Sequence, residues 1–240
     1  MTDRPLSYAN RTGRRPGRTV RAMSAVLPGV AGVWSQVEPY ADAWHAHNVA
    51  TLGRPGRRLV VLGDSMAQGV GATSHDAGWV GQLAKRLTDG GVELEVLNLS
   101  ATGARVDDVL AQQLPALDGI GSRPDDVVVV MVGSNDLFGG RVHRERLPQA
   151  YAEIVERVPA GTLVCTLPQP TAAAGRANVH VERAAADGRV VMVDLRETGP
   201  SSWRGRLAGD FFHPNDAGYA AIADAVEPAV RAAFATPPRR

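Results

Sequence analysis

The 240-residue sequence has little cysteine and little lysine, and each scarcity excludes something. Cys165 is the single cysteine, so no disulfide can form within the chain. Its place in the apolar run TLVCTL favours a buried hydrophobic role over a reactive thiol. Lys85 is the single lysine, which leaves arginine to carry the positive charge. The chain has 26 basic and 25 acidic side chains, a formal net charge of +1. This charge is too small to attract nucleic acid, so we expect no nucleic-acid partner.

Long apolar runs are also absent. No stretch reaches the roughly 18 apolar residues that span a bilayer, so we expect no stable membrane insertion and a cytoplasmic protein. Export is the alternative: thirteen uncharged residues, 22–34, follow the pair Arg14 and Arg15, and residues 41–43 read Ala-Asp-Ala, a small-x-small cleavage pattern. Glycines and a proline interrupt that apolar stretch, and the cleavage pattern falls inside an expected helix.

The first 56 residues differ from the rest of the chain. Residues 1–21 hold one acid and six arginines, namely Arg4, Arg11, Arg14, Arg15, Arg18 and Arg21. This charge run predicts a solvated, mobile tail. A helix is expected over 36–52, followed by a Gly-Arg-Pro-Gly turn at 53–56. We therefore expect 1–56 to be an extension that packs on one domain formed by 57–240.

From residue 57 onward, short apolar runs alternate with segments of helical period. The runs are rich in β-branched residues and apolar on both faces, as buried parallel strands are: 58–62, 92–99, 126–132, 162–167 and 189–195. Apolar stripes between and after them predict helices that begin near Trp79, Val106, Leu147 and Asn215. Pro148 suits a first helical turn, and Pro228 is expected to kink or end the last helix.

This alternation predicts an α/β fold, a three-layer α/β/α sandwich around a parallel sheet. Five strands favour the flavodoxin-like order 2-1-3-4-5. In such a sheet, ligands bind beyond the carboxyl ends of the strands. The sequence places five notable residues there: Ser65 after the first strand, Gly103 after the second, Asn135 after the third, and Asp210 and His213 after the fifth.

Each of these residues has an ordinary structural role when taken alone. A serine after a strand caps a helix, a glycine makes a turn, and an Asn-Asp pair satisfies its own loop. Together they supply what acyl transfer needs: a nucleophile, a base, a carboxylate to orient the base, and donors for the oxyanion. Asp210 and His213 are three residues apart, so they can meet within one turn.

These blocks resemble the SGNH hydrolase superfamily, also called GDSL esterases and lipases. The resemblance rests on Gly63-Asp64-Ser65, Gly103, Gly133-x-Asn135-Asp136 and Asp210-x-x-His213, in that order, across residues 58–235. Met66 replaces the leucine of the family name, a change that conserves volume. The extension, residues 1–56, falls outside the resemblance.

The resemblance implies a serine hydrolase of carboxylic esters, with short acyl or O-acetyl esters as the expected substrates. It implies Ser65 as nucleophile, His213 as base and Asp210 as its partner. The backbone N–H groups of Ser65 and Gly103 and the Asn135 amide would form the oxyanion hole. It implies no cofactor and no metal, and a small-molecule ester as the partner. Neither the substrate-binding residues nor the oligomeric state can be read from the sequence.

Two alternatives remain open at this point. One is an SGNH-like domain that binds ligands without reacting. The other is a receiver-like phosphoacceptor domain, in which Asp64, Asp136 and Thr166 would fit three roles, but Arg196 stands where a lysine is needed.

Further expectations concern the residues around these positions. We expect the pocket walls to come from 137–140, 171–175 and the stretch around Trp203. His75 and Asp76 are expected to start a helix, and Asp64 to tie down its loop by hydrogen bonds.

Overall fold

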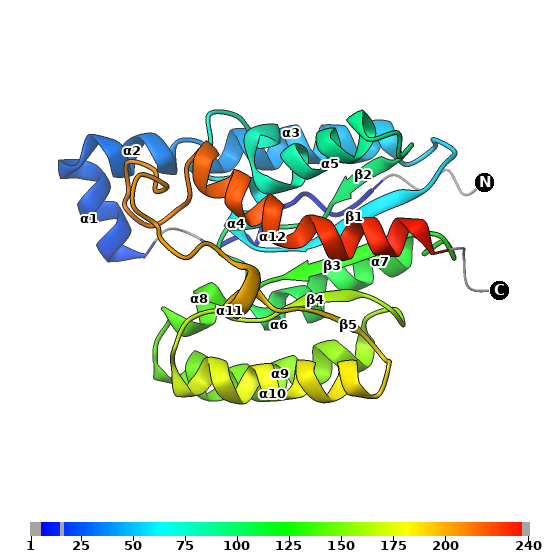
Figure 1. The fold of residues 1–240 in the computed structure, drawn as a ribbon. Coiled ribbons are helices and arrows are strands. Elements are labelled where there is room, and N and C mark those ends of the chain that lie inside the picture. The colour runs from blue at the N-terminus through cyan, green and yellow to red at the C-terminus, as the bar shows by residue number, and fades with distance from the viewer. Residues whose placement is uncertain (1–5, 15–16, 237–240) are drawn as a thin grey trace.

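A five-stranded parallel sheet forms the centre of the protein (Figure 1), in a computed structural model that describes residues 6–14 and 17–236. The strands are β1 (Arg58–Gly63), β2 (Glu95–Asn98), β3 (Val127–Met131), β4 (Leu163–Cys165) and β5 (Val191–Val193). All neighbouring strands are parallel, and their order is β2-β1-β3-β4-β5. The predicted α/β sandwich and strand order are therefore confirmed.

The described residues form fourteen helical elements, several of which flank the sheet on both faces. They are α1 (Arg18–Val26), α2 (Pro28–Trp34), α3 (Val37–Thr51), α4 (Ser65–Gln68), η1 (His75–Ala77), α5 (Trp79–Asp89), α6 (Val106–Asp108), η2 (Val109–Gln113), α7 (Leu114–Ile120), α8 (Ser134–Leu137), α9 (Arg141–Arg157), α10 (Ala172–Ala186), α11 (Leu195–Thr198) and α12 (Asp216–Ala235). η1 is a 3₁₀ turn and η2 a π turn that joins α6 to α7.

Successive residues of β1 enter two different cores because side chains alternate across a strand. Val60 and Leu62 join a core built with α7, α9 and α10. Leu59 and Val61 join a second core built with α5 and α12. Figure 1 shows α9 and α10 side by side beneath the sheet. The sheet is thus buried on both faces, which is why its strands read as continuous apolar runs.

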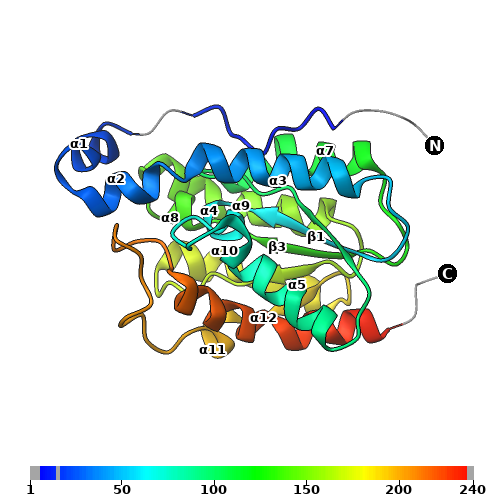
Figure 2. The same cartoon turned by 90° about the horizontal axis from the view of Figure 1, so that it is seen from above.

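Helix α3 covers the open edge of β2 and runs along the top of the view in Figure 2. The Asn48 amide donates to the carbonyl of Asn98 at 2.7 Å, and the Asn98 backbone N–H donates to Asn48 Oδ1 at 2.9 Å. A side chain therefore satisfies backbone groups of an edge strand that would otherwise be unpaired.

The expectation that Pro148 lies in a first helical turn is wrong, and so is the alternative that Pro228 ends its helix; that Pro228 kinks the helix stays a prediction. Helix α9 begins at Arg141, about two turns before Pro148, and an ion pair of 2.7 Å between Arg141 and Glu145 supports its polar first turn. Helix α12 continues through Pro228 to Ala235 without a break. Buried apolar residues on both sides of Pro228 pack against the sheet and outweigh the missing hydrogen bond.

The expected solvated, mobile tail is also wrong for residues 10–14. Asn10 is fully buried, and both Arg11 and Arg14 form ion pairs with acids of distant helices. A local count of charges could not reveal those acids. Arg4 and Arg15 lie outside the described residues. Within the part of the chain that the structure describes, no helix has both the length and the apolarity to cross a membrane.

Candidate active site

The loop after β1 presents Ser65 at the start of α4. Asp64 caps this short helix by accepting a hydrogen bond from the Met66 backbone N–H at 3.0 Å, as expected of a loop-fixing carboxylate. Gly63 is required before it because a Cβ there would lie 2.4 Å from the Met131 carbonyl oxygen. Since Ser65 is the first helical residue, its backbone N–H has no acceptor within the helix.

His213 lies between Ser65 and Asp210. Its Nε2 is 2.9 Å from Ser65 Oγ, and its Nδ1 is 2.6 Å from Asp210 Oδ2. Asp210 Oδ1 accepts the backbone N–H groups of Phe212 and His213, both at 3.0 Å. One carboxylate therefore fixes both the turn that carries the histidine and the orientation of its ring.

The same contacts set the charge of Asp210. Burial alone would raise the pKa of this carboxyl, but the hydrogen bond and charge of His213 and the two backbone donors lower it below its usual value. Asp210 is therefore ionised near neutral pH, in contact with the imidazole.

Gly71 makes room for the histidine. Its φ is +99°, and a Cβ at this position would lie 2.8 Å from His213 Cβ and 2.5 Å from the Pro214 carbonyl oxygen. The Tyr219 hydroxyl donates to the Val70 carbonyl at 2.6 Å, which ties this loop to α12. The two segments that carry Ser65 and His213 are thus packed directly against each other.

Gly103 lies on the loop after β2, and Asn135 lies in α8, the short helix after β3, at the same sheet edge. Gly103 has φ +77°, a conformation that favours glycine. The Asn135 amide donates to the Ala104 carbonyl at 3.0 Å, so α8 contacts the loop that carries Gly103. An amide has two N–H groups, and this contact leaves the other available to a further acceptor.

Two buried carboxyl groups flank the site. Burial raises the pKa of Asp64 to about 6 and that of Asp136 to about 7. Asp136 Oδ2 accepts the Val106 backbone N–H at 3.1 Å. Both residues are almost fully buried, and of the two only Asp64 contributes to the wall of the neighbouring cavity, so they do not form the paired acidic pocket of a receiver-like domain. Among the described residues, no three His, Cys, Asp or Glu side chains cluster as metal ligands would.

A cavity of about 570 Å³ opens beside these residues. Its wall includes the neighbours of the candidate residues: Asp64 and Met66 beside Ser65, Ser134 beside Asn135, and Phe212 and Pro214 beside His213. Most of the remaining wall is apolar and includes Phe138, Leu167, Leu195, Trp203, Leu207 and Phe211. Its volume lies in the usual range for small-molecule sites.

The expected pocket segments are partly correct. Phe138 and Trp203 line the cavity, whereas residues 171–175 begin α10 and do not. Residues 167–170 and 195–201 supply that part of the wall instead, because they follow β4 and β5 at the same sheet edge. His75 and Asp76 form η1, as expected of a helix start.

Sequence reasoning missed Gln68 and the segment 8–14, which contact the loop of Gly103. Gln68 and Asn10 are fully buried, and the polar partners of these segments are far away in the chain, so no local pattern marks such contacts.

The chain resembles known hydrolases. The sequence profile described as "GDSL-like Lipase/Acylhydrolase family" matches residues 61–221. Esterase TesA of Pseudomonas aeruginosa is 33% identical over 109 residues, which are 42% of this chain and 48% of the relative. The alignment thus spans about half the length of that curated relative.

Solved structures of esterases have a fold similar to that of this chain. A crystal structure of TesA superposes with a TM-score of 0.57 and 25% identity, over 73% of this chain and 99% of that one. The Clostridium thermocellum family 3 carbohydrate esterase shares the fold, with a TM-score of 0.55 and 20% identity over 75% of this chain and 97% of the other. The profile match covers well over half of the sequence and includes all five candidate residues, from Ser65 after β1 to His213 before α12. The resemblance seen in the sequence is thereby confirmed, and the chain belongs to the GDSL-like lipase/acylhydrolase family of enzymes.

Proposed function

We propose that this chain is a serine esterase in which Ser65 is the nucleophile, His213 the general base and Asp210 the partner that orients the base. The observation that supports this most directly is the continuous chain of contacts from Asp210 through both ring nitrogens of His213 to Ser65 Oγ. A hydroxyl alone is a weak nucleophile at neutral pH and needs such a base to remove its proton.

In the first step, Ser65 Oγ attacks the carbonyl carbon of the ester while His213 Nε2 takes the hydroxyl proton. The π electrons of the carbonyl move onto its oxygen. Collapse of this tetrahedral intermediate breaks the bond to the alcohol, which leaves with the proton from His213. Asp210, ionised and bonded to Nδ1, stabilises the imidazolium between these events.

The second step releases the acid. Water gives a proton to His213 and attacks the acyl-enzyme, and Ser65 Oγ recovers the proton as it leaves. In both steps the negative oxygen would be bound by the backbone N–H groups of Ser65 and Gly103 and by the Asn135 side-chain amide. Each such donor contributes about 10²–10³-fold to the rate of comparable enzymes.

The cavity supports esters with an apolar acyl group as substrates. A volume of about 570 Å³ exceeds what an acetyl group needs, and Leu167, Leu195 and Trp203 offer apolar contacts. We therefore extend the expected short acyl and O-acetyl esters to longer acyl chains. No cofactor or metal enters the proposed steps.

The test compares wild type with Ser65→Ala. Hydrolysis of p-nitrophenyl acetate, butyrate, octanoate and palmitate is measured, together with intact mass after exposure to a fluorophosphonate probe. We expect turnover and one adduct in wild type, both lost in the variant. A wild type that forms no adduct and matches the variant's background rate would disprove the esterase proposal in favour of a domain that binds ligands without reacting.

A further inference from the structure

We propose that the N-terminal strap, defined as residues 8–14, positions the oxyanion loop, defined as residues 100–105, and that Thr12 and Arg14 are its positioning residues. This inference rests on the proposed role of Gly103 as an oxyanion donor. It assigns to part of the extension, residues 1–56, a function in the hydrolase domain, residues 57–240.

Asn10 anchors the strap in the interior. It is fully buried and has φ 56°, a left-handed conformation that asparagine tolerates better than most residues. Its amide donates to the carbonyls of Asn98 at 2.7 Å and Ser100 at 3.0 Å, and its Oδ1 accepts from the Asn48 amide at 3.2 Å. The strap is therefore fixed at the end of β2, where the oxyanion loop begins.

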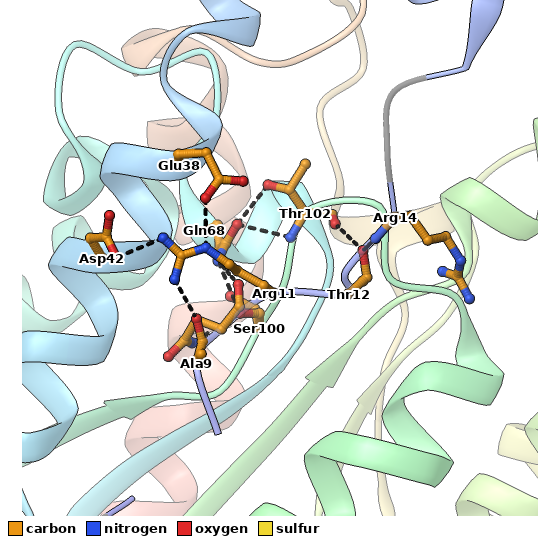
Figure 3. Close-up of polar contacts among 10 residues, drawn as sticks. Ala9, Arg11, Thr12, Arg14, Glu38, Asp42, Gln68, Ser100 and Thr102 are labelled. Carbon is orange, nitrogen blue, oxygen red and sulfur yellow. Dashed lines mark hydrogen bonds and ion pairs between the residues drawn. The ribbon is translucent and has the colours of Figure 1, made fainter. Parts of the chain in front are cut away.

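Gln68 joins the strap to the nucleophile helix α4. Its Nε2 donates to the Asn10 carbonyl at 2.9 Å and to the Ser100 carbonyl at 3.1 Å. Its Oε1 accepts both the backbone N–H and the hydroxyl of Thr102, at 2.8 Å and 2.6 Å. Figure 3 shows Gln68 between the strap and Thr102. One buried side chain thus links the strap, the oxyanion loop and the helix that begins at Ser65.

Arg11 fixes the strap from the other side. Its guanidinium donates to Glu38 and Asp42 of α3, each at 2.6 Å, as Figure 3 shows. Its backbone forms an isolated parallel bridge with Thr102. The strap therefore runs alongside the oxyanion loop, held between that loop and α3.

The next residues hold the peptide units on both sides of the Gly103 Cα. The Thr12 hydroxyl donates to the Thr102 carbonyl at 3.3 Å (Figure 3), and Arg14 Nη1 donates to the Gly103 carbonyl at 3.1 Å. Because a peptide unit is planar, fixing the Thr102 carbonyl also fixes the direction of the Gly103 N–H. That N–H is the proposed oxyanion donor.

A carboxylate holds the Arg14 guanidinium in place. Arg14 donates to both oxygens of Asp108, with Nη2 at 2.6 Å from Oδ1. Asp108 also accepts the Arg105 backbone N–H at 2.7 Å, at the far end of the oxyanion loop. Arg14 therefore connects the middle of this loop to its end. The strap lies outside residues 61–221, the region that identifies the family.

The experiment uses the full-length chain with Arg14→Gln, Thr12→Val and Arg14→Lys. The matched control is Arg146→Gln, since Arg146 pairs with Asp107, the neighbour of Asp108 on α6, and forms its hydrogen bonds and ion pairs with Asp107 and Glu153 rather than with the oxyanion loop. Esterase kinetics are combined with hydrogen exchange of peptides that span the loop. We expect Arg14→Gln to lower kcat about tenfold, part of the value of one oxyanion donor, with KM changed less than twofold.

Thr12→Val, which replaces the hydroxyl with a methyl group of similar size, should act in the same direction, and Arg14→Lys should recover part of the loss. Loop amides should exchange faster in Arg14→Gln and not in Arg146→Gln. Wild-type kcat and exchange in both Arg14→Gln and Thr12→Val would overturn the inference, as would equal losses in the control. If wild type shows no turnover and no adduct on Ser65, the esterase proposal fails instead, and the exchange rates alone decide whether the strap positions the loop.

Discussion

His213 Nε2 lies 2.9 Å from Ser65 Oγ, although 148 residues separate the two in the chain. The contact exists because residues 210–213, which precede α12, lie at the same sheet edge where β1 ends. Glycine at position 71 lets the two segments approach, and Asp210 orients the ring. The proposed chemistry depends on this contact, and so do the first predictions.

Asp210→Asn should lower kcat by about 10²–10⁴-fold, the range for loss of a general base. The asparagine amide would donate to His213 Nδ1 and leave a protonated Nε2 facing Ser65, which cannot then accept the hydroxyl proton. Steady-state kinetics on p-nitrophenyl butyrate measure the effect, with circular dichroism as the control for folding. Activity within threefold of wild type would remove Asp210 from the proposed triad.

Asn135→Ala should lower kcat by about 10²–10³-fold and change KM far less, because an oxyanion donor acts mainly in the transition state. Asn135→Asp provides the matched variant: it keeps the size and replaces the donor by an acceptor. We expect it to be at least as slow as the alanine variant. An unchanged kcat in Asn135→Ala would refute the oxyanion assignment.

The buried Asp136 predicts a pH-dependent stability. An unfolded aspartate has a pKa of about 3.9, whereas burial raises that of Asp136 to about 7. The protonated form therefore favours the folded state, and this contribution is complete below about pH 4 and lost as pH rises to about 7. Asp136→Asn keeps an acceptor for the Val106 N–H and has no carboxyl to ionise, so its stability should not fall in this way as pH rises.

Accordingly, the Tm of Asp136→Asn minus that of wild type should increase between pH 4.5 and 7.5 in a thermal-shift series. Asp107→Asn is the control, since that side chain is half exposed on α6. A difference that stays constant across this range would show that burial does not perturb Asp136.

Patterns local in the sequence predicted much of this molecule. Strands β1 to β4 are buried on both faces, with the edge strand β5 partly exposed, so the apolar runs revealed the sheet and, through it, which loops share an edge. That step brought Ser65, Gly103, Asn135, Asp210 and His213 to one place. Asp210 and His213 could also be paired from spacing alone, since three residues fit one turn.

The N-terminal strap could not be predicted in this way. Arg11 and Arg14 looked like unpaired surface charges because their partners, Glu38, Asp42 and Asp108, are 27 to 94 residues away. The start of α9 was missed for a related reason: its first turns are polar and stabilised by an ion pair rather than by an apolar stripe.

Gly71→Ala should lower kcat by displacing His213. The new Cβ would lie 2.8 Å from His213 Cβ, and the residue would keep a strained φ of +99°. The histidine would have to shift, and a displacement of about 1 Å can cost 10²-fold in rate. Gly56→Ala is the control, since φ is +112° there and no atom lies within 4 Å of the added carbon. Equal kinetic losses in the two variants would mean that strain, not contact with His213, is responsible.

Phe211 combines two unfavourable features that predict a role in substrate binding. It has φ 57°, which costs a non-glycine residue roughly 1–2 kcal/mol, and the residue is 81% exposed while it lines the cavity. Its neighbour Phe212 packs edge-on against Phe138 and against the His213 ring, which leaves Phe211 as the more exposed aromatic. Strain and exposed apolar surface persist together where a ligand uses them.

Phe211→Gly removes both the ring and the strain, whereas Phe211→Ala removes only the ring. We therefore expect the glycine variant to be the more thermostable of the two. Both should reduce kcat/KM for the octanoate ester about tenfold relative to the acetate ester, because a longer acyl chain loses apolar contact with the ring. The measurement is the ratio of kcat/KM for the two esters in each variant. If that ratio equals the wild-type ratio in both, Phe211 does not contact the acyl chain, and only the difference in Tm between the two variants should remain.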